Sequence, residues 1–203
     1  MSYDTVANDQ AIMKTVQALE ANGMHAVVAA TSAEAKEKVL AMLPADSEVM
    51  QMASLTLDSM GLTQEINESG KYRSVKATLM SMDQKTQGRE MSRLGSAPEY
   101  AVGSVHALTE NGQAMIASMT GSQLAAYASG AAHVIWVVGT QKIVKDLDDG
   151  MKRIYEYVLP LESERVKAAY GLPSSSVNKV LVVNKEFAPG RVTVVIVKES
   201  MGF

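Results

Sequence analysis

A single glutamate lies in a turn between two extended, mostly uncharged segments of the chain. Glu110, with Asn111 and Gly112, separates residues 101–108 from residues 113–118. A carboxylate at a strand end of an α/β sheet lies where ligands bind, and burial that raises its pKa lets it act as a nucleophile or base. Asn-Gly is also typical of a type I′ hairpin turn, so a plain turn is the alternative.

Three further segments place hydroxyl groups, glycines or a lysine where an expected strand passes into an expected helix. Free backbone N–H groups and the positive end of the helix dipole attract an anion to such a junction. A lysine there opposes the dipole, which hints at an anionic ligand. Helix capping, a tight turn and a solvated lysine are the structural alternatives. The candidate residues are Ser54, Thr56, Gly121, Ser122, Gly139 and Lys142.

The remaining residue types exclude several kinds of site. His25, His106 and His133 show no metal-ligand spacing, and only His106 is close to Glu110 in sequence. The chain has no cysteine, which excludes disulfides, thiolate zinc sites, cysteine-ligated iron–sulfur clusters and a cysteine nucleophile. Dinucleotide, P-loop and serine-hydrolase motifs are absent from the sequence. We therefore expect no metal and no cofactor held covalently or through cysteine.

Composition favours one soluble domain. The 203 residues carry a formal net charge of −3, so nothing in the overall charge attracts nucleic acid. No segment approaches the roughly 20 apolar residues that span a bilayer, and residues 1–8 lack the basic-then-apolar order of a signal peptide. We expect a cytoplasmic protein with a single α/β domain over residues 1–203.

Helical and extended patterns alternate along the chain. Apolar spacing and stop signals predict helices at 8–23, 31–43, 83–94, 123–129, 142–158 and 161–170, with Pro160 interrupting the last two. Apolar runs predict strands at 25–30, 47–52, 133–138, 179–184 and 191–198, with extended pieces at 100–107 and 113–118. The alternation indicates a mostly parallel, open sheet flanked by helices, with a pair of strands at the C-terminal end.

Several of these segments together resemble the LUD domain of lactate-utilisation proteins. The resemblance lies in residues 54–57, 106–113, 120–123, 137–147, 157–162, 176–179 and 187–193, and in Gly202-Phe203. It implies a fold of the phosphosugar-isomerase and CoA-transferase-like group, with the site at strand ends. It also implies a part in bacterial lactate oxidation beside an iron–sulfur protein. Because this chain has no cysteine, it would be the clusterless member.

Thr109-Glu110-Asn111-Gly112 also resembles the Ser-Glu-Asn-Gly element of CoA-transferases, whose glutamate forms a thioester. The resemblance implies that Glu110 is catalytic, with Thr109, Asn111 and Gly112 beside the ligand.

Three hypotheses follow from the residues and the resemblance. The first is a LUD-type protein that binds a small carboxylate or phosphorylated ligand near Ser54, Glu110 and Gly121. The second is a stand-alone acyl-transfer enzyme that uses a CoA ester. The third is a non-catalytic subunit that holds an iron–sulfur partner. A homo-oligomer is left open.

Overall fold

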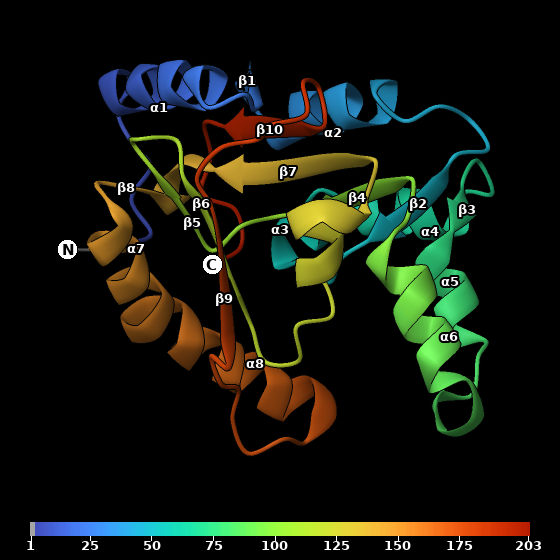
Figure 1. Ribbon diagram of the computed structural model, residues 1–203. Helices are drawn as coiled ribbons and strands as arrows, with labels where there is room; N and C mark the ends of the chain where they lie inside the picture. Colours follow the sequence, from blue (N-terminus) through green and yellow to red (C-terminus); the bar gives the residue numbers. More distant parts are fainter. Residues whose placement is uncertain (1–2) are drawn as a thin grey trace.

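A six-stranded, all-parallel sheet forms the centre of the molecule in the computed structural model, which describes residues 3–203 (Figure 1). The strand order is β1-β10-β7-β4-β2-β3. The strands are β1 (His25–Ala29), β2 (Glu48–Gln51), β3 (Arg73–Ser74), β4 (Tyr100–Gly103), β7 (His133–Gly139) and β10 (Val192–Val197). This is the mostly parallel α/β sheet that the alternating sequence pattern predicts.

A second, four-stranded sheet has the order β8-β5-β6-β9. Its strands are β5 (Ala107–Thr109), β6 (Ala114–Ser118), β8 (Ile143–Val144) and β9 (Lys179–Val183). Antiparallel pairing of β5 with β6 confirms the hairpin predicted at residues 110–112. The extended piece predicted at 100–107 is divided between the two sheets, because β4 ends at Gly103 and β5 begins at Ala107.

The two C-terminal strands both form, but they do not pair with each other as expected. β9 joins the edge of the second sheet beside β6, whereas β10 lies between β1 and β7 in the first. Their burial explains the separation. Every residue of β10 except Thr193 is buried, which suits a central strand covered on both faces, while β9 is only half-buried.

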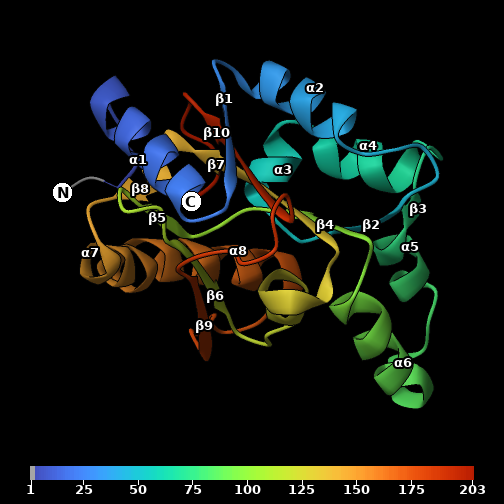
Figure 2. The same cartoon turned by 45° about the horizontal axis from the view of Figure 1, so that its top comes forward.

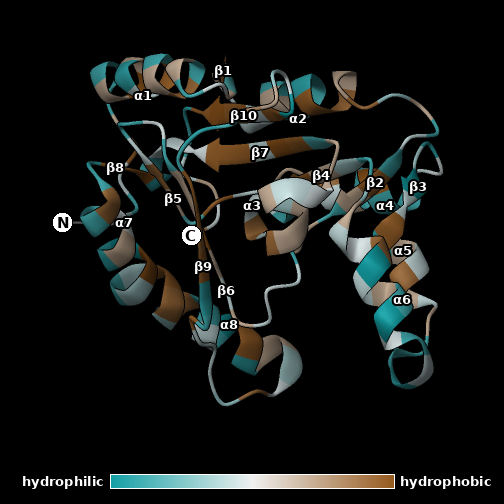
Figure 3. Cartoon of the chain, in the orientation of Figure 1, coloured by the Kyte–Doolittle hydropathy of each residue, from teal (hydrophilic) through white to brown (hydrophobic). Residues whose placement is uncertain are grey.

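The helices and the second sheet cover the two faces of the first sheet. Side chains alternate along β7, so that Trp136 packs on one face and Val137 on the other. The face of Trp136 lies against the second sheet and α1 (Asp9–Ala21). The opposite face lies against α2 (Ser32–Ala41), α3 (Leu55–Ser59) and α4 (Leu62–Glu68). Figure 3 shows the apolar colour of β7 and β10 between these layers.

Two further groups of helices flank the sheets. α5 (Val75–Met80) and α6 (Gln84–Ser96) stand at the β3 end of the sheet, at the opposite end of the molecule from α7 (Leu147–Lys152) in both cartoon views (Figures 1 and 2). Helix α7 continues through the π-helical turn η3 (Arg153–Val158) into α8 (Leu159–Tyr170). This ridge covers the outer face of the second sheet, where Ile154 packs against Ala107 and Met115.

The ridge corrects two predicted boundaries. The helix predicted from Lys142 begins only at Leu147, because residues 140–142 form the 3₁₀ turn η2 (Thr140–Lys142) and the Asp146 side chain caps α7 by accepting the Asp149 N–H. Pro160 does not interrupt the ridge. It lies at the start of α8, directly after the π turn, where the Leu159 N–H reaches the Ile154 carbonyl and the helical register changes.

None of the helices within residues 3–203 is long and apolar enough to cross a membrane.

Candidate functional site

A cavity of about 500 Å³ opens where β2, β4 and β7 reach their carboxyl ends. This is the edge at which open parallel sheets bind ligands. The second sheet contributes the segment before β5 and the end of β6, and α8 closes the opposite side. Polar or charged residues of the lining are Gln51, Ser54, Thr56, Asp58, Lys76, Ser104, His106, Ser118, Thr120, Ser122, Gln123, Tyr127, Lys142, Glu162, Arg165, Tyr170, Ser175 and Ser176.

Lys142 is the buried cation of this cavity. It follows β7 in the turn η2, and its side chain reaches back to the ends of the neighbouring strands, with only 2% of the residue exposed. Its Nζ donates to Thr56 Oγ1 at 3.0 Å, to Ser104 Oγ at 3.2 Å and to the Val105 carbonyl at 3.3 Å. No carboxylate among residues 3–203 forms an ion pair with it.

The surroundings of Lys142 lower the pKa of its amine. Burial penalises the charged ammonium, and the nearby Arg153 guanidinium repels it, so the pKa of Lys142 falls from 10.5 to about 7. Arg153 is itself buried and donates to the His106 carbonyl. Its guanidinium lies over the rings of Tyr3 and Tyr157, with centroids at 6.0 and 5.2 Å. The second cation is thus held by π faces and carbonyls, and not by a carboxylate.

The C-terminal segment at Met201 and Gly202 packs against Thr56 and Gln141, beside this lysine. Thr56 Oγ1 donates to the Met201 carbonyl at 3.1 Å, and Gln141 Nε2 donates to the same carbonyl at 2.9 Å. Gly202 adopts a φ of 59°, and a Cβ there would come within 2.7 Å of Thr56 Oγ1. Glycine is therefore required for the chain to pass so close to the hydroxyl.

The structure brings four predicted site residues to the cavity: Ser54, Thr56, Ser122 and Lys142. Ser54 stands at the N-cap of α3, directly before Leu55, and its side chain makes no capping hydrogen bond. The capping interpretation of this serine therefore has no support from a side-chain hydrogen bond, and the residue lines the cavity. The 3₁₀ turn that replaces the expected helix start is what buries Lys142.

The other predicted residues lie outside the cavity lining. Glu110 is at the tip of the β5–β6 hairpin, where its Oε2 accepts from Lys14 Nζ at 2.7 Å, with the Lys14 side chain 57% exposed. Asn111 and Gly112 sit against the end of α1, since their carbonyls accept from Asn22. Thr109 is buried and bonds to Gln113.

The two remaining predicted glycines shape the chain near the cavity without lining it. Gly121 has a φ of 89°, and its N–H donates to Ser118 Oγ, which turns the chain so that Ser122 reaches the lining. Gly139 packs so closely on Gln141 and the Glu199 carbonyl that a Cβ has no room. Each therefore acts through its backbone.

Lys76 and Ser104 are among the polar residues of the lining that sequence reasoning missed. Lys76 Nζ donates to Gln51 Oε1 at 2.9 Å, and no carboxylate of the described residues pairs with this lysine either. Ser104 directly follows β4, the same kind of strand end that singled out Ser54. That signal was available in the sequence, whereas the approach of Lys76 depends on how α5 packs on β2.

His106 is half-buried in the lining and keeps a defined hydrogen-bonding role. Its Nδ1 accepts the Ala117 N–H at 3.1 Å, which leaves the proton of the neutral ring on Nε2. Burial, with the charges of Lys142 and Arg153, lowers the pKa of His106 to about 3. The imidazole is therefore neutral near pH 7 and presents one N–H donor.

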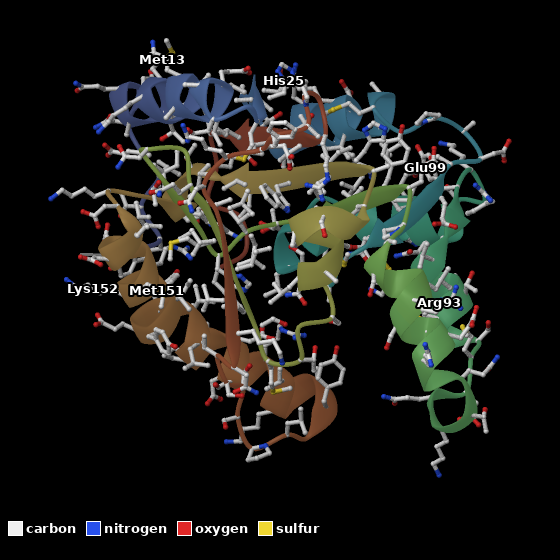
Figure 4. All side chains as sticks on the ribbon, viewed as in Figure 1. Met13, His25, Arg93, Glu99, Met151 and Lys152 are labelled. Carbon is white, nitrogen blue, oxygen red and sulfur yellow. The ribbon has the colours of Figure 1, made fainter. Side chains whose placement is uncertain are left out.

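The other two histidines belong to the periphery. His25 lies at the edge of the molecule beside α1, where Nδ1 is 3.0 Å from Glu20 Oε1 (Figure 4). His133 stacks on Tyr100 with ring centroids 4.7 Å apart. Within the part of the chain that the structure describes, no three histidine, aspartate or glutamate side chains gather as metal ligands.

Comparison with known proteins agrees with this architecture. The model of the LUD domain family matches residues 12–197. A DUF162 family protein from Deinococcus radiodurans has a similar crystal structure, with a TM-score of 0.56 over 95% of this chain and 99% of that one, at 11% sequence identity. No curated protein matches the chain in sequence. Because the family match spans nearly the whole sequence, the chain belongs to the LUD domain family.

Proposed function

We propose that this LUD domain protein binds a small carboxylate or phosphorylated ligand in the cavity at the strand ends. The observation that carries the proposal is a cavity with two lysines, Lys142 and Lys76, neither of which pairs with a carboxylate of the described residues. A buried cation is costly unless an anion compensates it. A ligand carboxylate or phosphate would supply that charge.

The other charges of the lining do not replace such an anion. Glu162 is engaged by Arg165 through two hydrogen bonds of 2.7 Å, so this pair neutralises itself. Asp58 is exposed and accepts from Thr63. The volume of about 500 Å³ suits a small molecule. Hydroxyl groups of Ser54, Thr56 and Ser122 add donors for ligand oxygens.

Membership of the LUD domain family supports a part for this protein in bacterial lactate and organic-acid utilisation. In such a system this chain would act as the clusterless subunit or accessory protein, because a protein without cysteine has no thiolate for an iron–sulfur cluster. Any cluster would then lie in a partner. Acyl transfer from a CoA ester through Glu110, and a purely structural role beside an iron–sulfur protein, stay as predictions without a supporting contact at the cavity.

Thermal unfolding with a panel of anions tests the proposal. Lactate, other hydroxy acids, sugar phosphates and CoA esters are added at increasing concentration, and we expect at least one class to raise the Tm progressively. Lys142→Met and Lys76→Met should abolish most of this rise. Lys145→Met is the matched control, because Lys145 is exposed and outside the lining, so it should behave as the wild type.

Two outcomes would contradict the proposal. One is the absence of any ligand-dependent rise in the wild type across the panel. The other is an unchanged rise in both Lys142→Met and Lys76→Met. A Glu110→Gln variant tests a different position for the ligand. If this variant loses the ligand-dependent rise in Tm, the ligand binds at the hairpin tip instead, where Glu110 pairs with Lys14.

A further inference from the structure

Ser104 and Lys142 bring together, in the cavity, a hydroxyl that can be a nucleophile and an amine that can be its base. Ser104 Oγ lies 3.2 Å from Lys142 Nζ, within hydrogen-bonding distance. Both residues line the cavity, and each follows a strand of the central sheet. A nucleophile in contact with a base, which is itself oriented by a third group, is the arrangement of covalent catalysis.

Thr56 is that third group, because the hydrogen bonds around Lys142 leave one direction for the serine. Thr56 has a single hydroxyl proton, which it donates to the Met201 carbonyl at 3.1 Å, so Thr56 Oγ1 can only accept from the lysine. The Val105 carbonyl can also only accept. A neutral amine has two N–H bonds, and these two acceptors use both. The amine lone pair, 3.2 Å from Ser104 Oγ, is then left to accept the serine proton, which otherwise goes to the Val105 carbonyl at 3.4 Å.

We propose that Ser104 and Lys142 act as nucleophile and general base in cleaving a carboxylic ester or thioester that enters the cavity. This inference adds an activity to the proposed binding function and does not depend on which free anion the cavity holds.

Each step of the reaction balances in atoms and charge. Lys142 accepts the proton of Ser104 while Ser104 Oγ bonds to the acyl carbon, giving a tetrahedral oxyanion. Collapse of this intermediate breaks the bond to the leaving alcohol or thiol, which takes the proton from Lys142. Water then gives a proton to Lys142 and attacks the acyl-serine. Breakdown of this second tetrahedral intermediate returns the proton from Lys142 to Ser104 and releases the carboxylic acid. The net reaction is hydrolysis, with water as the only co-reactant.

Two neighbouring groups suit this reaction. The N–H at Nε2 of His106 has no hydrogen-bond partner among the described residues, and it is two positions from Ser104 in the chain. His106 lines the same cavity as Ser104, so we assign this N–H as the donor to the oxyanion. Lys76, bonded only to the neutral Gln51 side chain, is a cation for an anionic group elsewhere on the substrate. The substrate class is therefore an ester or thioester that also carries a carboxylate or phosphate.

The ionisation of Lys142 is compatible with both roles of the cavity. With a pKa of about 7, the amine is partly neutral near pH 7 and can accept a proton. The charged Arg153 and the neutral His106 are its titratable neighbours, and the other charged groups of the cavity lining are Lys76, Asp58 and the Glu162–Arg165 pair. A rise in pH increases the neutral fraction, so it should weaken anion binding at Lys142 while increasing the reactivity of Ser104.

A fluorophosphonate probe tests the pair directly, because it reacts with activated serine hydroxyls and leaves a stable phosphonyl group on the serine. The full-length protein is incubated with the probe between pH 6 and pH 8.5, and the adduct is measured by intact mass and located by peptide mapping. We expect one adduct at Ser104, formed faster as the pH rises. Ser104→Ala should give none, and Lys142→Met should label at least about 100-fold more slowly. Ser163→Ala, a half-buried serine outside the lining, should label as the wild type.

Peptide mapping of the folded wild type decides the matter even if a variant fails to fold. No adduct at Ser104, or an adduct that forms equally fast in folded Lys142→Met, would overturn the proposal. Failure here differs from failure of the proposed binding function, because the thermal-unfolding panel uses free anions and needs no reaction at Ser104.

Discussion

Replacing Lys142 by methionine is expected to remove a pH dependence of stability worth about 4 kcal/mol between pH 7 and pH 10. In the native protein this amine is almost fully buried and has a pKa of about 7, against 10.5 for an exposed lysine. In the unfolded chain it is solvated and holds its proton up to the ordinary value. The two states therefore bind different numbers of protons across this range.

The sign follows from that difference. Between pH 7 and pH 10 the unfolded state binds more protons at Lys142, so the free energy of unfolding rises with pH. Above both pKa values the amine is neutral in both states and its burial costs least. Below pH 7 it is charged in both, and the full cost of burying the ammonium is present. Methionine has no proton to bind, so this contribution to the slope disappears.

Urea unfolding at pH 7, 8, 9 and 10 measures the effect. The free energy of unfolding of the wild type should rise relative to that of Lys142→Met by about 1.4 kcal/mol for each pH unit. Lys145→Met, which removes an exposed lysine three residues away, should run parallel to the wild type. Parallel curves for Lys142→Met as well would mean that Lys142 has an ordinary pKa in the folded protein.

Arg191→Met should lower the free energy of unfolding by about 3–5 kcal/mol. Arg191 donates from NH1 to Glu186 Oε2 at 2.6 Å, and both side chains are nearly buried, with exposed fractions of 11% and 12%. Its other nitrogens donate to the carbonyls of Ala126, Tyr127 and Ala131, in and just after the π turn η1 (Ala126–Gly130). The substitution removes the guanidinium donors from a nearly buried carboxylate and from three carbonyls, although Glu186 keeps the Ala188 N–H and the Ala126 carbonyl keeps the Ala131 N–H.

This second effect reaches the cavity because η1 carries Tyr127, one of the lining residues. Tyr127 packs directly over Gly103, at the end of β4, where any added Cβ would overlap its hydroxyl.

Urea unfolding of Arg191→Met and Arg191→Lys separates charge from geometry, since lysine keeps the ion pair but loses the planar fork. Arg73→Met is the control: its pair with Glu99 is exposed and 3.9 Å long, so we expect a change below about 0.5 kcal/mol. An equally small effect at Arg191 would contradict the account of η1.

The parallel sheet was predictable because its central strands, β7 and β10, are buried on both faces and therefore have continuous apolar sequences. β7, with six buried residues in succession, is the strongest example. The second sheet could not be predicted. Its members come from segments before and after β7, and the pairing of β8 with β5 depends on contacts between residues far apart in the chain.

The difference between the two sheets also explains which site residues could be predicted. Ser54, Thr56 and Lys142 were predicted because they follow strands of the parallel sheet, and all three line the cavity. Glu110 also follows a strand, but that strand pairs antiparallel with β6 in the second sheet. The carboxyl ends of antiparallel strands lie at opposite edges, so a strand end there does not predict the same edge as the cavity. A catalytic role for Glu110 stays a prediction.

Lys142 also shows which property the sequence concealed. Its position after β7 indicated an anionic ligand, but only the fold shows that Thr56, Ser104 and Val105 meet its amine and that no carboxylate of the described residues does. The burial of Lys142 and its hydrogen-bond partners depend on the ends of three separate strands. No local sequence pattern predicts these contacts.

An NMR titration of the Lys142 side chain tests the central claim most directly. Its ¹³Cε and ¹⁵Nζ resonances, assigned by their absence in Lys142→Met, are followed from pH 5 to pH 10.5 with and without the anion that raises the Tm most. The account predicts a midpoint near pH 7 for the free protein, because the amine is buried beside Arg153, and a higher midpoint with the anion bound. A midpoint above pH 10 that does not respond to any anion would contradict it.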